Sequence, residues 1–190
     1  MALTAHRIPR LSAATPVLIV PGWTNSGPHH WQSWLQARHP DFVRVEQDDW
    51  DRPARAAWVA RLDEYVRASR TPPLLVAHSL GCMTVAHWAA LHSRPIHAAL
   101  LIAPPNLDAP SAPVEVADFR PVPMNPLTFR SLLVASTNDP RCELAVARRM
   151  ATLWRSDFLV AGASGHLNTD AGFGPWPLGE ELVLQLRERG

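Results

Sequence analysis

Short runs of consecutive apolar residues alternate along this chain with longer segments whose apolar residues recur every three or four positions. Apolar runs of four to six residues are typical of strands buried on both faces, and the longer period is typical of helices. The predicted strands cover residues 17–20, 42–45, 73–76, 98–103, 131–136 and 158–160, and the predicted helices cover 30–38, 53–66, 82–91, 143–154 and 178–187.

This alternation of strand and helix predicts an α/β fold, in which a mostly parallel sheet is covered by helices on both faces. A chain of 190 residues with 47% hydrophobic residues is long enough for one domain with one core. We expect residues 1–14 to be an irregular lead-in, because they contain no continuous apolar run. In such a sheet the reactive loops follow the carboxyl ends of the strands.

Composition narrows the classes of partner. A formal net charge of +1 argues against nucleic acid or an anionic membrane as the main partner. No apolar run approaches the roughly 18 residues of a membrane span, so no membrane association is expected. Two cysteines, Cys82 and Cys142, form no disulfide framework or metal-ligand cluster, and we expect buried, reduced thiols in a cytoplasmic protein.

The most informative segment is Ala77-His78-Ser79-Leu80-Gly81, which lies between a predicted strand and a predicted helix. A serine in this position, with small residues two places before and after it, is typical of a nucleophile elbow. The motif has glycine two places before the serine, whereas this chain has Ala77, which is still small. We expect His78 to form a hydrogen bond within the elbow.

Two later loops supply partners for Ser79. A serine nucleophile needs a base and a third group that orients the base, and in this motif the chain order is Ser, then Asp or Glu, then His. Asp139 follows the predicted strand 131–136, and His166 follows the predicted strand 158–160. Four other acids remain alternatives for the third group: Asp108, Asp118, Asp157 and Asp170.

The chemistry also needs backbone N–H donors for the developing oxyanion. We expect one donor to be the N–H of Leu80, directly after the serine. We expect the other to be the N–H of Trp23, because Gly22 before it permits the loop after the first strand to approach the serine closely. Trp50 is expected to contact substrate, and Trp176 is a candidate for either substrate binding or packing. The proline-rich segment 104–126 is long for a loop, and we expect it to form one side of the site.

Other groupings of polar residues do not indicate a cofactor. His29 and His30 lack the spacing of a metal site, so no metal is expected. Three nearby acids, Asp48, Asp49 and Asp51, are expected to orient a loop and to cap the helix that begins near Pro53. The first strand ends in Pro21-Gly22-Trp23 rather than in a glycine-rich phosphate loop, which argues against a nucleotide cofactor.

Several segments together resemble the small α/β-hydrolase family of retinoblastoma-binding protein 9 and the YdeN-type serine hydrolases. The segments that carry the resemblance are 20–26, 30–32, 47–50, 78–81, 138–140, 165–168 and 172–177, with Pro53 and Trp58, in the family's order along nearly the whole chain. The resemblance implies a compact α/β-hydrolase fold without a large lid domain. It also implies a catalytic triad of Ser79, Asp139 and His166.

The sequence therefore favours a serine hydrolase, carboxylesterase-like or amidase-like, that forms an acyl-enzyme. Its expected partner is a small-molecule acyl substrate, an ester, thioester or amide, without any cofactor. The alternative is a protein-interaction module on a hydrolase scaffold with little or no catalysis, because fold alone does not determine function.

Overall fold

A computed structural model describes residues 15–188 of the chain, so the lead-in expected over residues 1–14 lies outside the described residues. The strands are β1 Val17–Val20, β2 Phe42–Arg44, β3 Leu74–His78, β4 Ala98–Ile102, β5 Ser131–Ala135 and β6 Asp157–Val160. The helices are α1 Trp31–Arg38, α2 Arg55–Ala68, α3 Leu80–Leu91, α4 Leu144–Trp154 and α5 Pro177–Glu188, with short 3₁₀ turns η1 Val114–Phe119 and η2 Thr169–Ala171. Each predicted strand and helix is thus present, with ends shifted by a few residues.

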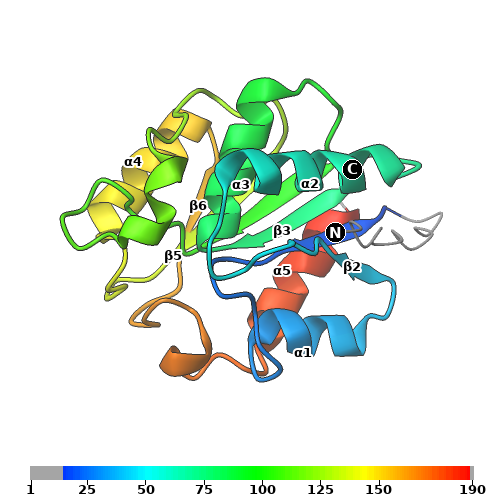
Figure 1. The fold of residues 1–190 in the computed structure, drawn as a ribbon. Coiled ribbons are helices and arrows are strands. Elements are labelled where there is room, and N and C mark those ends of the chain that lie inside the picture. The colour runs from blue at the N-terminus through cyan, green and yellow to red at the C-terminus, as the bar shows by residue number, and fades with distance from the viewer. Residues whose placement is uncertain (1–14, 189–190) are drawn as a thin grey trace.

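The six strands form one sheet in the order β2-β1-β3-β4-β5-β6, and every pairing within it is parallel. Helices α2, α3 and α4 cover one face of the sheet, and α1 and α5 cover the other (Figure 1). Successive side chains of a strand point to opposite faces, so Leu75 belongs to the first core and Val76 to the second. Burial on both faces explains why the predicted strands lack alternating polar residues.

The start of α2 differs from the prediction. Pro53 precedes the helix, whose N-cap is Ala54, and that residue offers no side-chain cap. Asp118, from η1, instead accepts a hydrogen bond from the backbone N–H of Arg55 at 2.7 Å. Of the acids expected to cap this helix, Asp49 stabilises its own loop by accepting from the N–H groups of Asp51 and Arg52. The cap therefore comes from a segment more than sixty residues away.

The long segment 104–126 packs on the core rather than forming a separate lid domain. The side chains of Val116 and Phe119 are buried against α2 and α3, and His87 of α3 bonds to the Phe119 carbonyl at 2.9 Å. Within residues 15–188, no helix is both long and apolar enough to cross a membrane. The architecture is a compact α/β-hydrolase fold, and its loops emerge from the carboxyl edge of the parallel sheet.

Candidate active site

Ser79 lies at the sharp turn between β3 and α3, with φ 54° and ψ −124°. A non-glycine residue at positive φ is strained, and here the strain raises the side chain above the strand end. Gly81 permits the start of α3 to lie directly against the end of β1, because a Cβ there would collide with the backbone carbonyl oxygens of Val20 and Pro21. Ala77 is fully buried in β3 and fits where the motif has glycine. The segment therefore forms the elbow that its sequence predicts.

Ser79, His166 and Asp139 form a continuous chain of hydrogen bonds. The Ser79 hydroxyl donates to His166 Nε2 at 2.8 Å. His166 Nδ1 lies 2.9 Å from both carboxylate oxygens of Asp139. Because a carboxylate only accepts hydrogen bonds, Nδ1 carries the proton and Nε2 is free to accept from the serine. The structure thus brings together three residues that are predicted from three separate loops.

The His166 loop is fixed by the turn that follows β5. Asn138 Oδ1 accepts from the N–H of Gly165 at 2.8 Å, and the buried Ser136 hydroxyl accepts from the N–H of Ser164 at 2.9 Å. The Ser136 hydroxyl donates in turn to Asn138 Oδ1 at 2.8 Å. Acid and histidine are therefore held by one hydrogen-bonded unit rather than by two independent loops.

The loop after β1 approaches the elbow closely at Gly22. A Cβ there would lie 2.9 Å from the Ser79 Cβ and 3.2 Å from the Leu80 nitrogen. The backbone amides of Trp23 and Leu80 both line the space beside Ser79, and neither has a hydrogen-bond partner within residues 15–188. Two unpartnered N–H groups beside a nucleophile form the arrangement that an oxyanion requires.

Arg44 stabilises the loop that follows β1. Its guanidinium is buried and donates to Asn25 Oδ1 at 2.6 Å, the Ser26 carbonyl at 2.9 Å and the Ser33 hydroxyl at 2.8 Å. Gln36 Oε1 accepts a fourth hydrogen bond at 3.1 Å. Within the described chain no carboxylate forms an ion pair with Arg44, and burial lowers its pKa. A buried cation held only by neutral acceptors fixes the loop through hydrogen-bond geometry.

Two further histidines lie beside His166. The sequence predicts a hydrogen bond from His78 within the elbow, and this prediction is wrong. The His78 Nε2–H donates instead to the His166 backbone carbonyl at 2.9 Å, in the histidine loop. The His30 ring lies 4.8 Å from the His78 ring, and its Nδ1 accepts from the Gln32 N–H at the start of α1. Burial lowers the pKa of His78 well below its usual value and lowers that of His30 to about 3. Both rings are therefore neutral at physiological pH.

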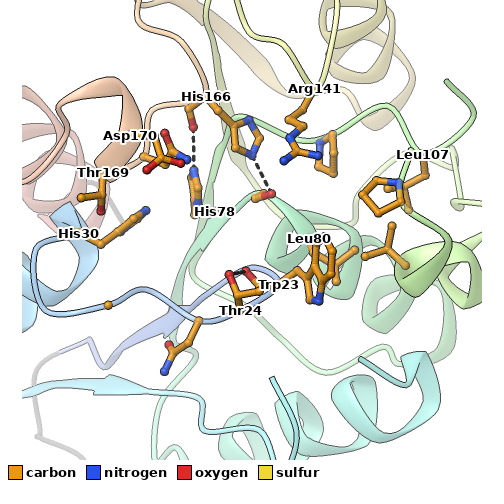
Figure 2. Close-up of a pocket in the computed structure, with 17 residues that line it drawn as sticks. Trp23, Thr24, His30, His78, Leu80, Leu107, Arg141, His166, Thr169 and Asp170 are labelled. Carbon is orange, nitrogen blue, oxygen red and sulfur yellow. Dashed lines mark hydrogen bonds between the residues drawn. The ribbon is translucent and has the colours of Figure 1, made fainter. Parts of the chain in front are cut away.

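The triad opens into a cavity of about 410 Å³ with two contrasting walls (Figure 2). We call the polar wall the set Thr24, Asn25, His30, Asn168, Thr169 and Asp170, and the apolar wall the set Pro105, Leu107, Pro113 and Val116. The apolar wall comes from segment 104–126, which confirms its predicted position beside the site. Figure 2 shows His30, Thr169 and Asp170 on one side of His166 and Leu107 on the other.

Trp50, predicted to contact substrate, and Trp176, a candidate for substrate binding or packing, both lie outside this cavity. Trp50 packs edge-on against Trp58, with ring centroids 5.5 Å apart, and its carbonyl accepts from the Thr24 N–H. Trp176 is buried against Trp31, with ring centroids 5.2 Å apart. Both therefore support the loops around the site through packing, and their placement gives no support to a direct role in substrate binding.

Among the acids left open as alternatives, only Asp170 lines the cavity, and Asp139 is the one that bonds to His166. Several lining residues are not predicted as site residues, among them His30, which is considered only as a metal ligand, and Arg141. Arg141 could have been found, since it lies two residues after Asp139 in the same turn. Within residues 15–188, no group of three or more His, Cys, Asp or Glu side chains could hold a metal ion.

Comparison with known proteins agrees with this fold. A YdeN-like hydrolase from Pectobacterium atrosepticum is 28% identical, with a TM-score of 0.82 over 92% of this chain and 91% of that one. The YdeN gene product of B. subtilis is 19% identical, with a TM-score of 0.77 over 91% of this chain and 98% of that one. The esterase RhEst1 of a Rhodococcus species is 15% identical, with a TM-score of 0.70 over 97% of this chain and 94% of that one. A comparison with curated proteins found no match. The serine hydrolase family model matches residues 17–185, and the chain therefore belongs to the serine hydrolase family.

Proposed function

We propose that this hydrolase cleaves a small carboxylic ester, thioester or amide through an acyl-enzyme formed on Ser79. The observation that carries the proposal is the hydrogen-bond chain from Ser79 through His166 to Asp139, with spacings of 2.8 and 2.9 Å, at the base of an open cavity. A cavity of about 410 Å³ has the volume of a small-molecule site, so it fits a small acyl substrate.

In the first half-reaction, the Ser79 oxygen attacks the substrate carbonyl carbon while His166 Nε2 takes the hydroxyl proton. The carbonyl oxygen gains negative charge and accepts hydrogen bonds from the amides of Leu80 and Trp23. His166 then gives its proton to the leaving alcohol, thiol or amine, and the bond from the carbonyl carbon to that group breaks. Asp139 keeps the proton of Nδ1 in place and stabilises the charged imidazole.

In the second half-reaction, water attacks the acyl carbon while His166 Nε2 accepts one of its protons. The same amides again stabilise the oxyanion. The bond between the acyl carbon and the Ser79 oxygen breaks, His166 returns the proton to that oxygen, and the carboxylic acid leaves. No other group is needed to balance protons or electrons.

A fluorophosphonate probe tests the proposal, because it forms a stable bond only with an activated serine. We expect intact mass spectrometry to show one adduct on the wild type, none on Ser79→Ala, and slow labelling of His166→Ala. Ser93→Ala, which removes an exposed serine beyond the end of α3, should label like the wild type. Absence of an adduct on folded wild type would contradict the proposal and favour the protein-interaction module.

A further inference from the structure

The cavity contains one cationic side chain that the mechanism above does not use. Arg141 lines the same cavity as Ser79, and Figure 2 shows it beside His166, on the side of Leu107. No carboxylate within residues 15–188 forms an ion pair with this guanidinium, and no described side chain or carbonyl accepts a hydrogen bond from it. An arginine that faces a catalytic cavity without a partner is free to bind a carboxylate or phosphate with its planar fork.

The backbone of Arg141 is fixed to the catalytic machinery. Its N–H donates to Asp139 Oδ1 at 2.8 Å, and its carbonyl accepts from the N–H of Asn106 at 2.9 Å. The first bond joins it to the triad acid and the second joins it to the start of segment 104–126. The side chain therefore extends from a rigid point between the triad and the apolar wall.

The other charges around the cavity make this position distinctive. The carboxylate of Asp139 is almost fully buried and is bonded to His166. Asp170 belongs to the polar wall, and Figure 2 shows it on the opposite side of His166 from Arg141. His30 and His78 are neutral, since burial lowers their pKa values. The positive charge in the cavity is thus located at its apolar end and the negative charge at its polar end.

We propose that the substrate carries an anionic group, such as a carboxylate, on the part that lies along the apolar wall, and that Arg141 binds this group. The proposal rests on the hydrolase function above and defines the class of its substrate. A half-ester of a short dicarboxylic acid has the required features, with an apolar chain between the reacting carbonyl and the anion. Its hydrolysis would release the dicarboxylic acid and the leaving group.

The test compares esters matched in size but different in charge. The first pair shares p-nitrophenol as leaving group and differs in the acyl group, hemiglutarate against pentanoate. The second pair shares a butyryl group and differs in the leaving group, 4-hydroxybenzoate against 4-hydroxybenzamide. For each pair, the ratio of kcat/KM for the anionic ester to that for the neutral ester is measured in wild type, Arg141→Gln and Arg149→Gln.

We expect Arg141→Gln to lower the ratio by about tenfold in one of the two pairs, the size of one charge-assisted hydrogen bond at a partly exposed site. The affected pair identifies whether the anion belongs to the acyl or the leaving group. Arg149→Gln removes the same charge from an exposed position on α4 and should leave both ratios unchanged. Unchanged ratios in Arg141→Gln, or equal losses in both variants, would overturn the proposal.

A binding measurement separates this proposal from the hydrolase function. The anionic ligand matches the affected pair, monomethyl glutarate for the acyl pair or 4-butyryloxybenzoate for the leaving-group pair, and is titrated calorimetrically into Ser79→Ala, which cannot form an acyl-enzyme. We expect the affinity of the Ser79→Ala protein for this ligand to fall about tenfold when Arg141→Gln is added, and to stay unchanged when Arg149→Gln is added. A wild type that fails to turn over esters, with this binding pattern intact, would contradict the function alone. Turnover without this binding pattern would contradict the role of Arg141 alone.

Discussion

The two walls of the cavity differ in what holds them. The polar wall depends on hydrogen bonds: Arg44 fixes Asn25, and the Asn138 and Ser136 side chains fix the His166 loop. The apolar wall depends mainly on burial, with Leu107 and Val116 packed on the core. Directional bonds fix atoms to within tenths of an ångström, whereas apolar packing fixes volume and shape. We therefore expect changes beside the polar wall to affect chemistry and stability, and changes in the apolar wall to affect substrate choice.

The largest expected effect comes from Gly22→Ala, at the contact between the β1 loop and the elbow. The new Cβ would meet the Ser79 Cβ at 2.9 Å and push the Trp23 amide away from the oxyanion. Losing one such donor costs about 10²–10³ in kcat. Steady-state hydrolysis of a p-nitrophenyl ester measures the loss, and thermal unfolding verifies the fold. A folded variant with wild-type kcat would show that this contact does not position the donor.

Next in size is Arg44→Lys, which tests whether the guanidinium network supports the polar wall. Lysine cannot reach four acceptors from one position, so a buried charge and several buried acceptors lose partners. We expect the free energy of unfolding to fall by about 2–4 kcal/mol, measured by urea denaturation. Arg67→Lys on the exposed face of α2 is the control, with a change within about 0.5 kcal/mol. Equal losses in both variants would contradict the role of the network.

A smaller and different effect is expected from Leu107→Ala in the apolar wall. Removing three carbon atoms from a buried side chain enlarges the cavity and weakens apolar contact with substrate. We expect KM for a pentanoate ester to rise about tenfold, with a smaller change in kcat. Leu91→Ala, at an exposed site on α3, should leave KM unchanged. A loss confined to kcat would show that the apolar wall also positions the reacting groups.

The last expected effect is confined to acid pH: it concerns the pH dependence of stability and depends on His30 of the polar wall. In the unfolded chain a histidine binds a proton below pH about 6.5, whereas the pKa of folded His30 is about 3. The unfolded state therefore binds more protons between these values, and the stability present above pH 6.5 is lost as pH falls toward 3.

His30→Asn should reduce this loss while keeping an acceptor for the Gln32 N–H at the start of α1. The slope of unfolding free energy against pH should become shallower by up to about 1.4 kcal/mol per pH unit, the value for one proton. Urea denaturation at pH 7, 6, 5 and 4 measures it. Parallel curves for wild type and variant would show that His30 is not protected from protonation.

The fold and the Ser79–His166–Asp139 arrangement follow from local patterns, because each residue follows a predicted strand and parallel strands end at one edge. Two corrections involve contacts between distant segments: Asp118 caps α2 across 63 residues, and His78 bonds to a carbonyl 88 residues away. Trp50 packs on the nearby Trp58, a contact that its position after a strand does not reveal. Sequence spacing constrains which loop a residue occupies, but the neighbour it finds depends on how helices and loops pack in three dimensions.

Backbone strain is distributed unevenly over the molecule. Among the described residues, six non-glycine positions have positive φ, and all except Arg155 lie at the carboxyl edge of the sheet: Thr24, Asn25, Ser79, Ala103 and Leu167. Each such residue costs on the order of 1 kcal/mol. Efforts to raise the heat resistance of this enzyme should therefore target the helices and the opposite edge, where a gain in Tm carries no penalty in turnover. At the carboxyl edge, substitutions that relieve this strain are expected to raise Tm and to lower the catalytic rate.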